Sequence, residues 1–165
     1  MRCQVISFLC VFLVCLISLG DNSIAGESAS VTAQWREVFV TTASHTMSPE
    51  GIEGRRFGVM QQRGMAFYQD GTVSRLDAWL TYESDYGNTK YRGLVLYTFP
   101  DGATQAADFE GEGAAVGRQK GTFTFINGTG RFEGIKGGGT FTAVGVSREA
   151  DLYVDVKAKY TVPES

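Results

Sequence analysis

The alternation of apolar and polar residues is the strongest pattern in this chain, and it is clearest near the C-terminus. From Ala150 to Val162, apolar residues or tyrosine occupy every second position, with mostly charged residues between them. Successive side chains of a strand point to opposite faces, so the segment predicts a strand with one buried and one solvated face. Leu76 to Tyr86 repeats the pattern, with Trp79 as an exception on its polar face.

The segment Tyr91 to Phe99 differs because apolar residues occupy both of its faces. Such a strand is either central in the structure or covered by a second layer, for example a partner subunit. Turn signals separate these segments: Asp70-Gly71 and Asp101-Gly102 are strong hairpin dipeptides, and Asn127-Gly128 is a third. The polar segment from Ser44 to Arg56, with one proline and two glycines, predicts a long loop.

Short strands, hairpin turns and the near absence of helical periodicity predict an all-β fold of roughly eight antiparallel strands, as a sandwich or a barrel. Glycines inside the strand-like segments, such as Gly93 and Gly145, favour a single barrel because they allow sharp bending. We expect little or no helix after the N-terminal region, and we see no linker that would divide the chain into two domains.

The N-terminus has the three parts of a secretory signal peptide. Arg2 supplies a positive charge, Val5 to Leu19 is almost wholly apolar, and small residues precede a plausible cleavage site before Gly26. A membrane anchor is the alternative, but the apolar run is shorter than the roughly 20 residues that span a bilayer. We therefore expect a signal peptide at residues 1–25 and a secreted or periplasmic domain at 26–165 with a loose N-terminal segment and no membrane anchor after cleavage.

Composition narrows the chemistry. The three cysteines all lie inside the expected signal peptide, so the mature chain would have no thiol nucleophile, disulfide or cysteine-bound metal. The net charge of −3 comes with no basic cluster, so nucleic acid is not an expected partner. The single histidine, His45, favours a solvated loop position over a Ser-His-Asp triad. We expect no cofactor and no metal.

Two further patterns have both a functional and a structural interpretation. Gly128, Gly130 and Gly134 resemble a phosphate-binding loop, but the spacing is wrong and no helical pattern follows, so a tight turn between strands is favoured. Asp108, Glu110 and Glu112 share one strand face, which suits a paired acid and base or a calcium site. The structural interpretation of these acids is an exposed acidic face, because charged residues are mostly solvated.

The candidate ligand-binding residues come from a second set of positions. If alternation is unbroken from Phe57 to Phe67, Gln61 and Arg63 point into an apolar interior, where an arginine needs an acidic partner or an anionic ligand. The alternative is a bulge at Gly64 that turns Arg63 outward. Several tyrosines either line a cavity or belong to the core. The candidates are therefore Gln61, Arg63, Tyr68, Tyr82 and Tyr97, and no catalytic residue is assigned.

Two turn motifs carry a family resemblance. Tyr97 to Gly102 (YTFPDG) and Asn127 to Gly134 (NGTGRFEG) are similar to turns of the barrel superfamily that includes allene oxide cyclases, dirigent proteins and secreted bacterial relatives. The resemblance covers about half of the chain and implies an eight-stranded antiparallel barrel with a central cavity, often dimeric or trimeric. Plant members cyclise a fatty-acid epoxide or guide radical coupling without a cofactor, but their cavity residues have no motif that matches here.

These observations lead to three functional hypotheses. The first is a secreted or periplasmic barrel that binds a small, mainly apolar ligand without converting it. The second is a cofactor-free isomerase or cyclase of the allene oxide cyclase type. The third is a structural module that assembles as a homodimer or homotrimer, which the two-sided apolar segment from Tyr91 to Phe99 suggests.

Overall fold

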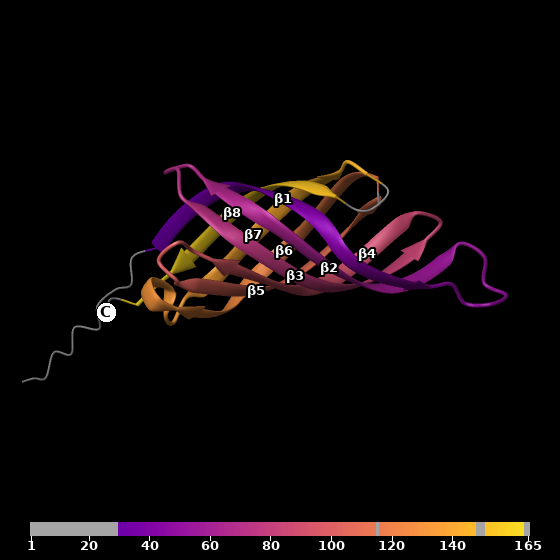
Figure 1. Ribbon diagram of the computed structural model, residues 1–165, viewed down its shortest axis with the longest axis horizontal. Coiled ribbons are helices and arrows are strands. Elements are labelled where there is room, and N and C mark those ends of the chain that lie inside the picture. The colour runs from indigo at the N-terminus through magenta and orange to yellow at the C-terminus, as the bar shows by residue number, and fades with distance from the viewer. Residues whose placement is uncertain (1–29, 115, 148–150, 164–165) are drawn as a thin grey trace, which may run out of the picture.

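Antiparallel strands form a closed barrel in the computed structural model, which describes residues 30–114, 116–147 and 151–163. Each strand pairs with its neighbours in the chain, and the last strand closes the barrel against the first (Figure 1). Within the described residues the elements are β1 (Ser30–Met47), β2 (Arg55–Tyr68), β3 (Val73–Asp85), β4 (Asn88–Thr98), β5 (Thr104–Ala114), β6 (Gly117–Thr129), the 3-10 helix η1 (Gly130–Phe132), β7 (Lys136–Gly145) and β8 (Leu152–Thr161). The predicted all-β, eight-stranded antiparallel barrel is confirmed.

The alternation seen in the sequence sets the inner and outer faces of two strands. In β8, Val154, Val156 and Ala158 are buried in the barrel, while the residues between them are exposed. In β3, Leu76 and Ala78 are buried in the same way. The apolar face predicted for Leu76 to Tyr86 is wrong only at its end, because Tyr86 lies in the turn after β3 and is 74 % exposed.

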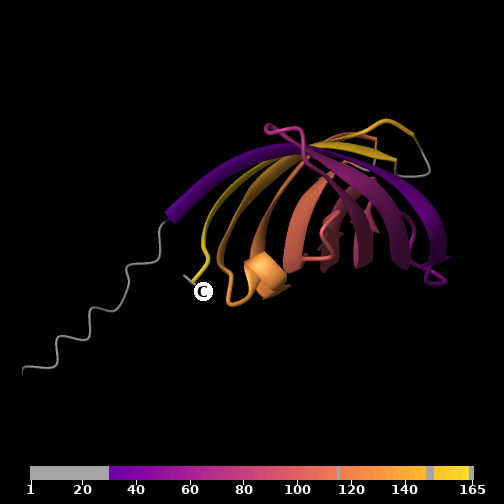
Figure 2. The same ribbon diagram turned by 60° about the vertical axis from the view of Figure 1, so that its left-hand side comes forward.

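The two ends of the barrel differ. At one end η1 covers the interior, and the Phe132 ring packs 4.7 Å from that of Phe99 (Figure 2). The Arg131 guanidinium lies over both rings at 4.9 Å and forms an ion pair with Asp101, so this end is sealed by aromatic packing. At the opposite end the β1–β2 and β3–β4 hairpins project beyond the rest of the barrel (Figure 1).

Three local predictions differ from the structure. The predicted loop from Ser44 to Arg56 is shorter, because β1 continues to Met47 and β2 begins at Arg55. Asn127-Gly128 forms no hairpin turn: both residues lie in β6, directly after the register shift at Ile126, and the reversal follows at η1. The N-terminal segment expected to be loose differs from Ser30 onward, where β1 begins, and its earlier residues lie outside the described part of the chain.

The expected signal peptide at residues 1–25 lies outside the described residues. Within the part that the structure describes, no helix is long and apolar enough to cross a membrane.

Candidate functional site

The barrel contains a cavity of about 310 Å³. Aromatic and aliphatic side chains form most of its wall, with a polar set at the end where the hairpins project and one acid, Glu37, among the buried residues. The apolar part of the wall includes Phe39, Leu80, Val95, Phe109, Phe123, Phe141, Leu152, Val154 and Val156. The cavity therefore suits a small and mainly apolar molecule that makes a few polar contacts.

Glu37 is the buried acid of this cavity. It follows Trp35 by two residues on β1, so both side chains point inward, and only 4 % of Glu37 is exposed. The indole Nε1 of Trp35 donates a hydrogen bond to Glu37 Oε1 at 2.6 Å, and the Tyr97 hydroxyl donates to the same oxygen at 2.8 Å. Both bonds fall on Oε1, so Oε2 is the oxygen that receives neither of them.

The burial of Glu37 changes its acidity. Removal from water disfavours the carboxylate and raises the pKa of Glu37 from 4.5 to about 7, while the two hydrogen bonds from Trp35 and Tyr97 oppose this rise. Burial also raises the pKa of Tyr97 well above its ordinary value, and the adjacent Glu37 adds to this effect. A carboxyl group with a pKa near neutrality can give or take a proton at physiological pH.

Trp35 and the rings around it hold Glu37 in place from the side of the barrel that η1 covers. The Trp35 ring stacks on Tyr68 at 5.3 Å and meets Tyr97 and Phe123 edge-on at 6.0 Å. These rings fill the barrel between Glu37 and the end covered by η1. Because Trp35 is fixed on several sides, its Nε1–H has a defined direction toward the carboxyl group.

Three pairs of aromatic residues and glycines make room for the cavity. One row of hydrogen-bonded strand neighbours places Tyr82 beside Gly58, Tyr91 beside Gly111, and Phe141 beside Gly121. A β-carbon at Gly58 would lie 2.6 Å from the Tyr82 ring, and one at Gly111 would lie 2.5 Å from the Tyr91 ring. A β-carbon at Gly121 would likewise collide with Phe141. Each ring thus lies against bare backbone of the wall instead of crossing the interior.

The Tyr91 hydroxyl is a further polar group of the cavity. It is buried and has no hydrogen-bond partner among the described residues. Burial raises the pKa of Tyr91, so the hydroxyl stays protonated and can donate a hydrogen bond. A buried hydroxyl without a partner costs about 1–3 kcal/mol, which a bound molecule with a suitable acceptor would offset.

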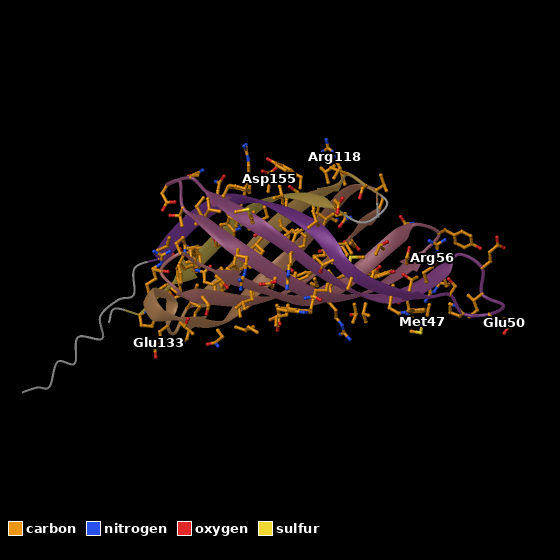
Figure 3. All side chains as sticks on the ribbon, viewed as in Figure 1. Met47, Glu50, Arg56, Arg118, Glu133 and Asp155 are labelled. Carbon is orange, nitrogen blue, oxygen red and sulfur yellow. The ribbon has the colours of Figure 1, made fainter. Side chains whose placement is uncertain are left out.

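Polar residues gather where the cavity opens. Arg56, Ser84 and Thr89 are inward residues of neighbouring strands and belong to the cavity lining. Figure 3 shows Arg56 beside the projecting hairpins, away from the end sealed by η1. Deeper by one inward position, the Tyr82 hydroxyl shares a hydrogen bond with Thr46 Oγ1. The opening is thus hydrophilic and contains a cation, while the middle of the cavity is apolar.

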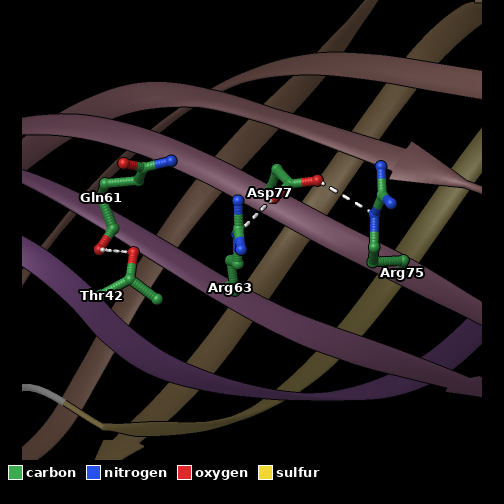
Figure 4. Close-up of polar contacts among 5 residues, drawn as sticks. All are labelled: Thr42, Gln61, Arg63, Arg75 and Asp77. Atoms are coloured by element: carbon green, nitrogen blue, oxygen red, sulfur yellow. Dashed lines mark hydrogen bonds and ion pairs between the residues drawn. The ribbon is translucent and has the colours of Figure 1, made fainter.

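The predicted inward orientation of Gln61 and Arg63 is wrong. Both lie on the outer face of β2, where Arg63 Nε contacts Asp77 Oδ1 at 3.2 Å and Arg75 Nε contacts Asp77 Oδ2 at 3.1 Å (Figure 4). The Gln61 carbonyl accepts a hydrogen bond from Thr42 on the adjacent strand. The Arg63 side chain is 64 % exposed, whereas that of Asp77 is 12 % exposed between the two arginines.

The error has a physical cause. The more apolar face of β2, with Val59, Met65 and Phe67, points outward and is partly exposed, while its glycines point inward. A β-carbon at Gly64 would collide with the carbonyl oxygen of Val38 on β1, so close packing inside the barrel requires glycine there. The proposed bulge at Gly64 is also absent: the register shift lies in β1, between Thr41 and Ala43.

The three tyrosine candidates point inward, but they occupy different levels. Tyr82 and Tyr97 line the cavity, whereas Tyr68 packs on Trp35 nearer the sealed end and is not part of the lining. The structure thus brings Tyr82 and Tyr97 together around one cavity and separates them from Tyr68, Gln61 and Arg63.

The acids of β5 lie on the outer surface. Asp108, Glu110 and Glu112 are exposed, and Glu112 forms an ion pair with Lys120 at 3.4 Å. Among the described residues, no group of three or more His, Cys, Asp or Glu could hold a metal ion. His45 is exposed as expected, although it lies in β1 opposite Val59 and not in a loop.

The sequence interpretation missed Glu37, Arg56, Tyr91 and the glycine partners of the rings. Around Glu37, apolar residues occur on both faces of β1 (Trp35 and Phe39 inside, Val38 and Val40 outside), so alternation does not identify the inner face. The glycines of β2 were the usable signal in the sequence. Gly58 and Gly64 mark the inner face of this strand, because neighbouring rings and backbone pack closely against them.

Comparisons with known proteins support the fold. No protein-family model and no curated protein matches the chain. Two solved structures are similar to it: the pterocarpan synthase dirigent protein PsPTS1, with 14 % identity, a TM-score of 0.52 and coverage of 84 % of this chain and 99 % of that one, and the pterocarpan synthase dirigent protein GePTS1, with 13 % identity, a TM-score of 0.52 and coverage of 93 % and 98 %. At this identity the likeness establishes a dirigent-like barrel fold, as the turn motifs implied.

Proposed function

We propose that this chain, which has the barrel fold of the dirigent proteins, binds a small and mainly apolar molecule inside its barrel. The observation that carries this proposal is the cavity of about 310 Å³, because its aromatic and aliphatic wall is interrupted by only a few polar groups. Natural ligand pockets have volumes of about 300–1,000 Å³ and the same mixed character. A ligand of one or two rings matches this volume.

Two polar groups inside the cavity indicate which functional groups such a ligand would have. Glu37 lies deep in the cavity with one carboxyl oxygen engaged by Trp35 and Tyr97, and the Tyr91 hydroxyl is buried without a partner. A ligand with a hydroxyl or carbonyl group would satisfy one or both. Because a binding site that contains buried polar groups rejects molecules unable to pair with them, these two groups would supply selectivity.

The binding proposal is tested by filling the cavity. Ala143 is buried and lines the cavity, whereas Ala106 lies on the outer face of β5. We expect isothermal titration to show binding of the neutral bicyclic probe naphthamide to the wild type and to Ala106→Phe, and at least tenfold weaker binding to Ala143→Phe. Circular dichroism checks that each variant is folded. A wild type that binds no apolar bicyclic probe, or an Ala143→Phe variant that is folded and binds normally, would contradict the proposal.

A cofactor-free isomerase or cyclase is the second candidate. The specific observation in its favour is a buried carboxyl group in the cavity wall, that of Glu37, which Trp35 and Tyr97 hold by hydrogen bonds. Burial raises its pKa to about 7, so it can protonate or deprotonate a bound molecule near neutral pH. In this function Tyr97 and Trp35 orient Glu37, and the apolar wall excludes water from the reacting molecule.

A simple ketone tests whether Glu37 exchanges protons with a bound molecule. In deuterium oxide, a carboxylate beside tetralone removes a proton from the carbon next to the carbonyl, and deuterium returns to that carbon. We expect NMR to show faster exchange with the wild type than with Glu37→Gln, and a rate that rises with pH around 7. Equal exchange rates for the two proteins would argue for binding without catalysis.

We also propose that the protein acts outside the cytosol after cleavage before Gly26. The support is the charged start, the apolar run and the small residues that precede this position. N-terminal sequencing of the protein exported by a secreting host should give Gly26 as the first residue. Retention of the full chain in the cytosol would refute the proposal without affecting the binding function.

A further inference from the structure

Arg55 and Arg56 are consecutive at the start of β2, and the alternation of the strand gives them opposite environments. Arg55 lies outside, where its guanidinium contacts Asp85 at 3.6 Å and Glu83 at 3.9 Å. Arg56 lies inside and belongs to the cavity lining. The two residues therefore form a matched pair: the same side chain at the same end of the same strand, on the two sides of the barrel wall.

Two acidic residues at this end of the barrel form ion pairs with Arg55, the arginine on the outer face. Glu83 and Asp85 both pair with Arg55, and Arg56 has no ion-pair partner among the residues that the structure describes. Arg56 is also the one cation among the described residues that line the cavity. An unpaired guanidinium at the opening of an apolar cavity offers several donors in a planar arrangement that matches a carboxylate.

The charges of the cavity are arranged along its length. Glu37 lies deep inside, next to Trp35 and Tyr97, whereas Arg56 lies at the opening. A ligand with an anionic group is repelled by Glu37 whenever Glu37 is ionised, and attracted by Arg56. The anionic group of such a ligand therefore belongs at the opening, with the rest of the molecule pointing inward.

Aromatic rings line the wall directly beneath Arg56. Tyr91, Phe109 and Phe141 lie with their ring centres 6.3–6.5 Å apart. The cluster starts level with Gly58 on β2. Gly58 follows Arg56 by two residues, so the cluster starts about 6.5–7 Å along the strand from Arg56. Edge-to-face and offset contacts with such rings favour a planar aromatic group. A charged group attached directly to a two-ring body can thus reach Arg56 while the rings contact this cluster.

We infer that the ligand is an aromatic molecule with a carboxylate or similar anionic group, held with its rings against Tyr91, Phe109 and Phe141 and its anionic group at Arg56. The inference rests on the proposed binding function and specifies the class of ligand.

Three probes of nearly equal shape test this inference. Naphthoate, naphthamide and naphthamidine share one ring system and differ in charge: negative, neutral and positive. In isothermal titrations of the wild type we expect naphthoate to bind about tenfold more tightly than naphthamide, the difference that one charge-assisted hydrogen bond supplies, and naphthamidine to bind most weakly. Added salt should reduce the preference for naphthoate, because Arg56 is exposed at the opening.

Two arginine variants test whether Arg56 is the source of the preference for naphthoate. Arg56→Gln should lose the tenfold preference for naphthoate and keep its affinity for naphthamide, whereas Arg55→Gln should keep both affinities. Equal binding of naphthoate and naphthamide to the wild type would overturn this inference and leave the binding function intact, as would equal effects of the two substitutions. If none of the probes binds, the binding function itself is refuted, and this inference with it.

Discussion

Glu37 is the residue whose environment departs most from that of its type in water. Its carboxyl group is buried, and its two hydrogen bonds come from Trp35 and Tyr97, which are themselves fixed by ring packing. Burial destabilises its ionised form, and the two hydrogen bonds offset this only in part. Its position at the inner end of the cavity suggests that it is retained for binding or for proton transfer.

The raised pKa of Glu37 makes stability depend on pH. Between pH 4.5 and about 7 the folded protein holds a proton that the unfolded chain has released, so the free energy of unfolding falls as pH rises through this window. The loss should be on the order of 3 kcal/mol and complete above about pH 7. Glu37→Gln, which keeps an acceptor for Trp35 and Tyr97, should lack this decrease. Urea unfolding of both proteins at several pH values measures the difference; parallel profiles would refute the assignment.

In contrast to the buried Glu37, Arg63 is an exposed charged residue, and it forms an ion pair with Asp77 on the outer surface of the barrel. We expect Asp77→Asn to lower the free energy of unfolding by about 1 kcal/mol, since the carboxylate between Arg63 and Arg75 is largely shielded while both arginines are mostly exposed. Ligand affinity should not change, because the cluster lies outside the barrel. Denaturant titration and naphthamide binding test the two statements; weaker binding by the folded variant would mean that this cluster communicates with the cavity.

At the level of strands, the cavity depends on the pairing of aromatic residues with glycines. Tyr82 with Gly58, Tyr91 with Gly111 and Phe141 with Gly121 are cross-strand pairs in which the ring lies against bare backbone. The spacing of glycines in β2, β5 and β6 therefore sets how much of the interior stays open.

The pair of Tyr91 and Gly111 allows a direct test. Gly111→Ala places a β-carbon where the Tyr91 ring lies, so the ring must turn into the cavity. We expect naphthamide to bind at least tenfold more weakly to this variant, as measured by isothermal titration. Replacing Tyr91 by Leu in the same chain should restore room and part of the affinity. Unchanged binding by Gly111→Ala would show that the ring does not limit the cavity.

The strands also show what the sequence could predict. Alternation identified the inner faces of β3 and β8, where polar and apolar residues separate cleanly. It failed in β2, because Val59, Met65 and Phe67 are on the outside, while glycines and polar residues such as Arg56 and Gln62 are on the inside. The cavity residues Glu37 and Tyr91 come from strands distant in the chain, and only the closed barrel brings them around one space.

At the scale of the whole molecule, several apolar side chains on the outer surface of the barrel are partly exposed to solvent. Val38, Val40, Met65 and Phe67 are each more than 40 % exposed on the paired strands β1 and β2. Trp79 on β3 is also exposed, but Arg63 and Asp77 separate it from these four residues. Val38 lies directly opposite Met65, and Val40 and Phe67 follow them along the two strands. Exposed apolar residues that adjoin one another in this way mark an interaction surface. We propose that further copies of this chain cover it in a homodimer or homotrimer.

The assembly is tested by light scattering coupled to gel filtration. We expect a mass of two or three chains for the wild type. Met65→Glu should shift the equilibrium toward the monomer, because it places a charge in the covered surface. Thr140→Glu, on the outer face of β7 and away from β1 and β2, should not. A wild type that is monomeric at all concentrations would exclude the proposal.

A hollow barrel that admits a small aromatic molecule can be observed directly. The most direct measurement is a crystal structure of the protein soaked with bromonaphthalene, in which anomalous scattering locates the bromine. We expect a bromine peak inside the barrel, between the Tyr91 ring and Glu37. A barrel filled by its own side chains, or bromine found only on the outer surface, would contradict it.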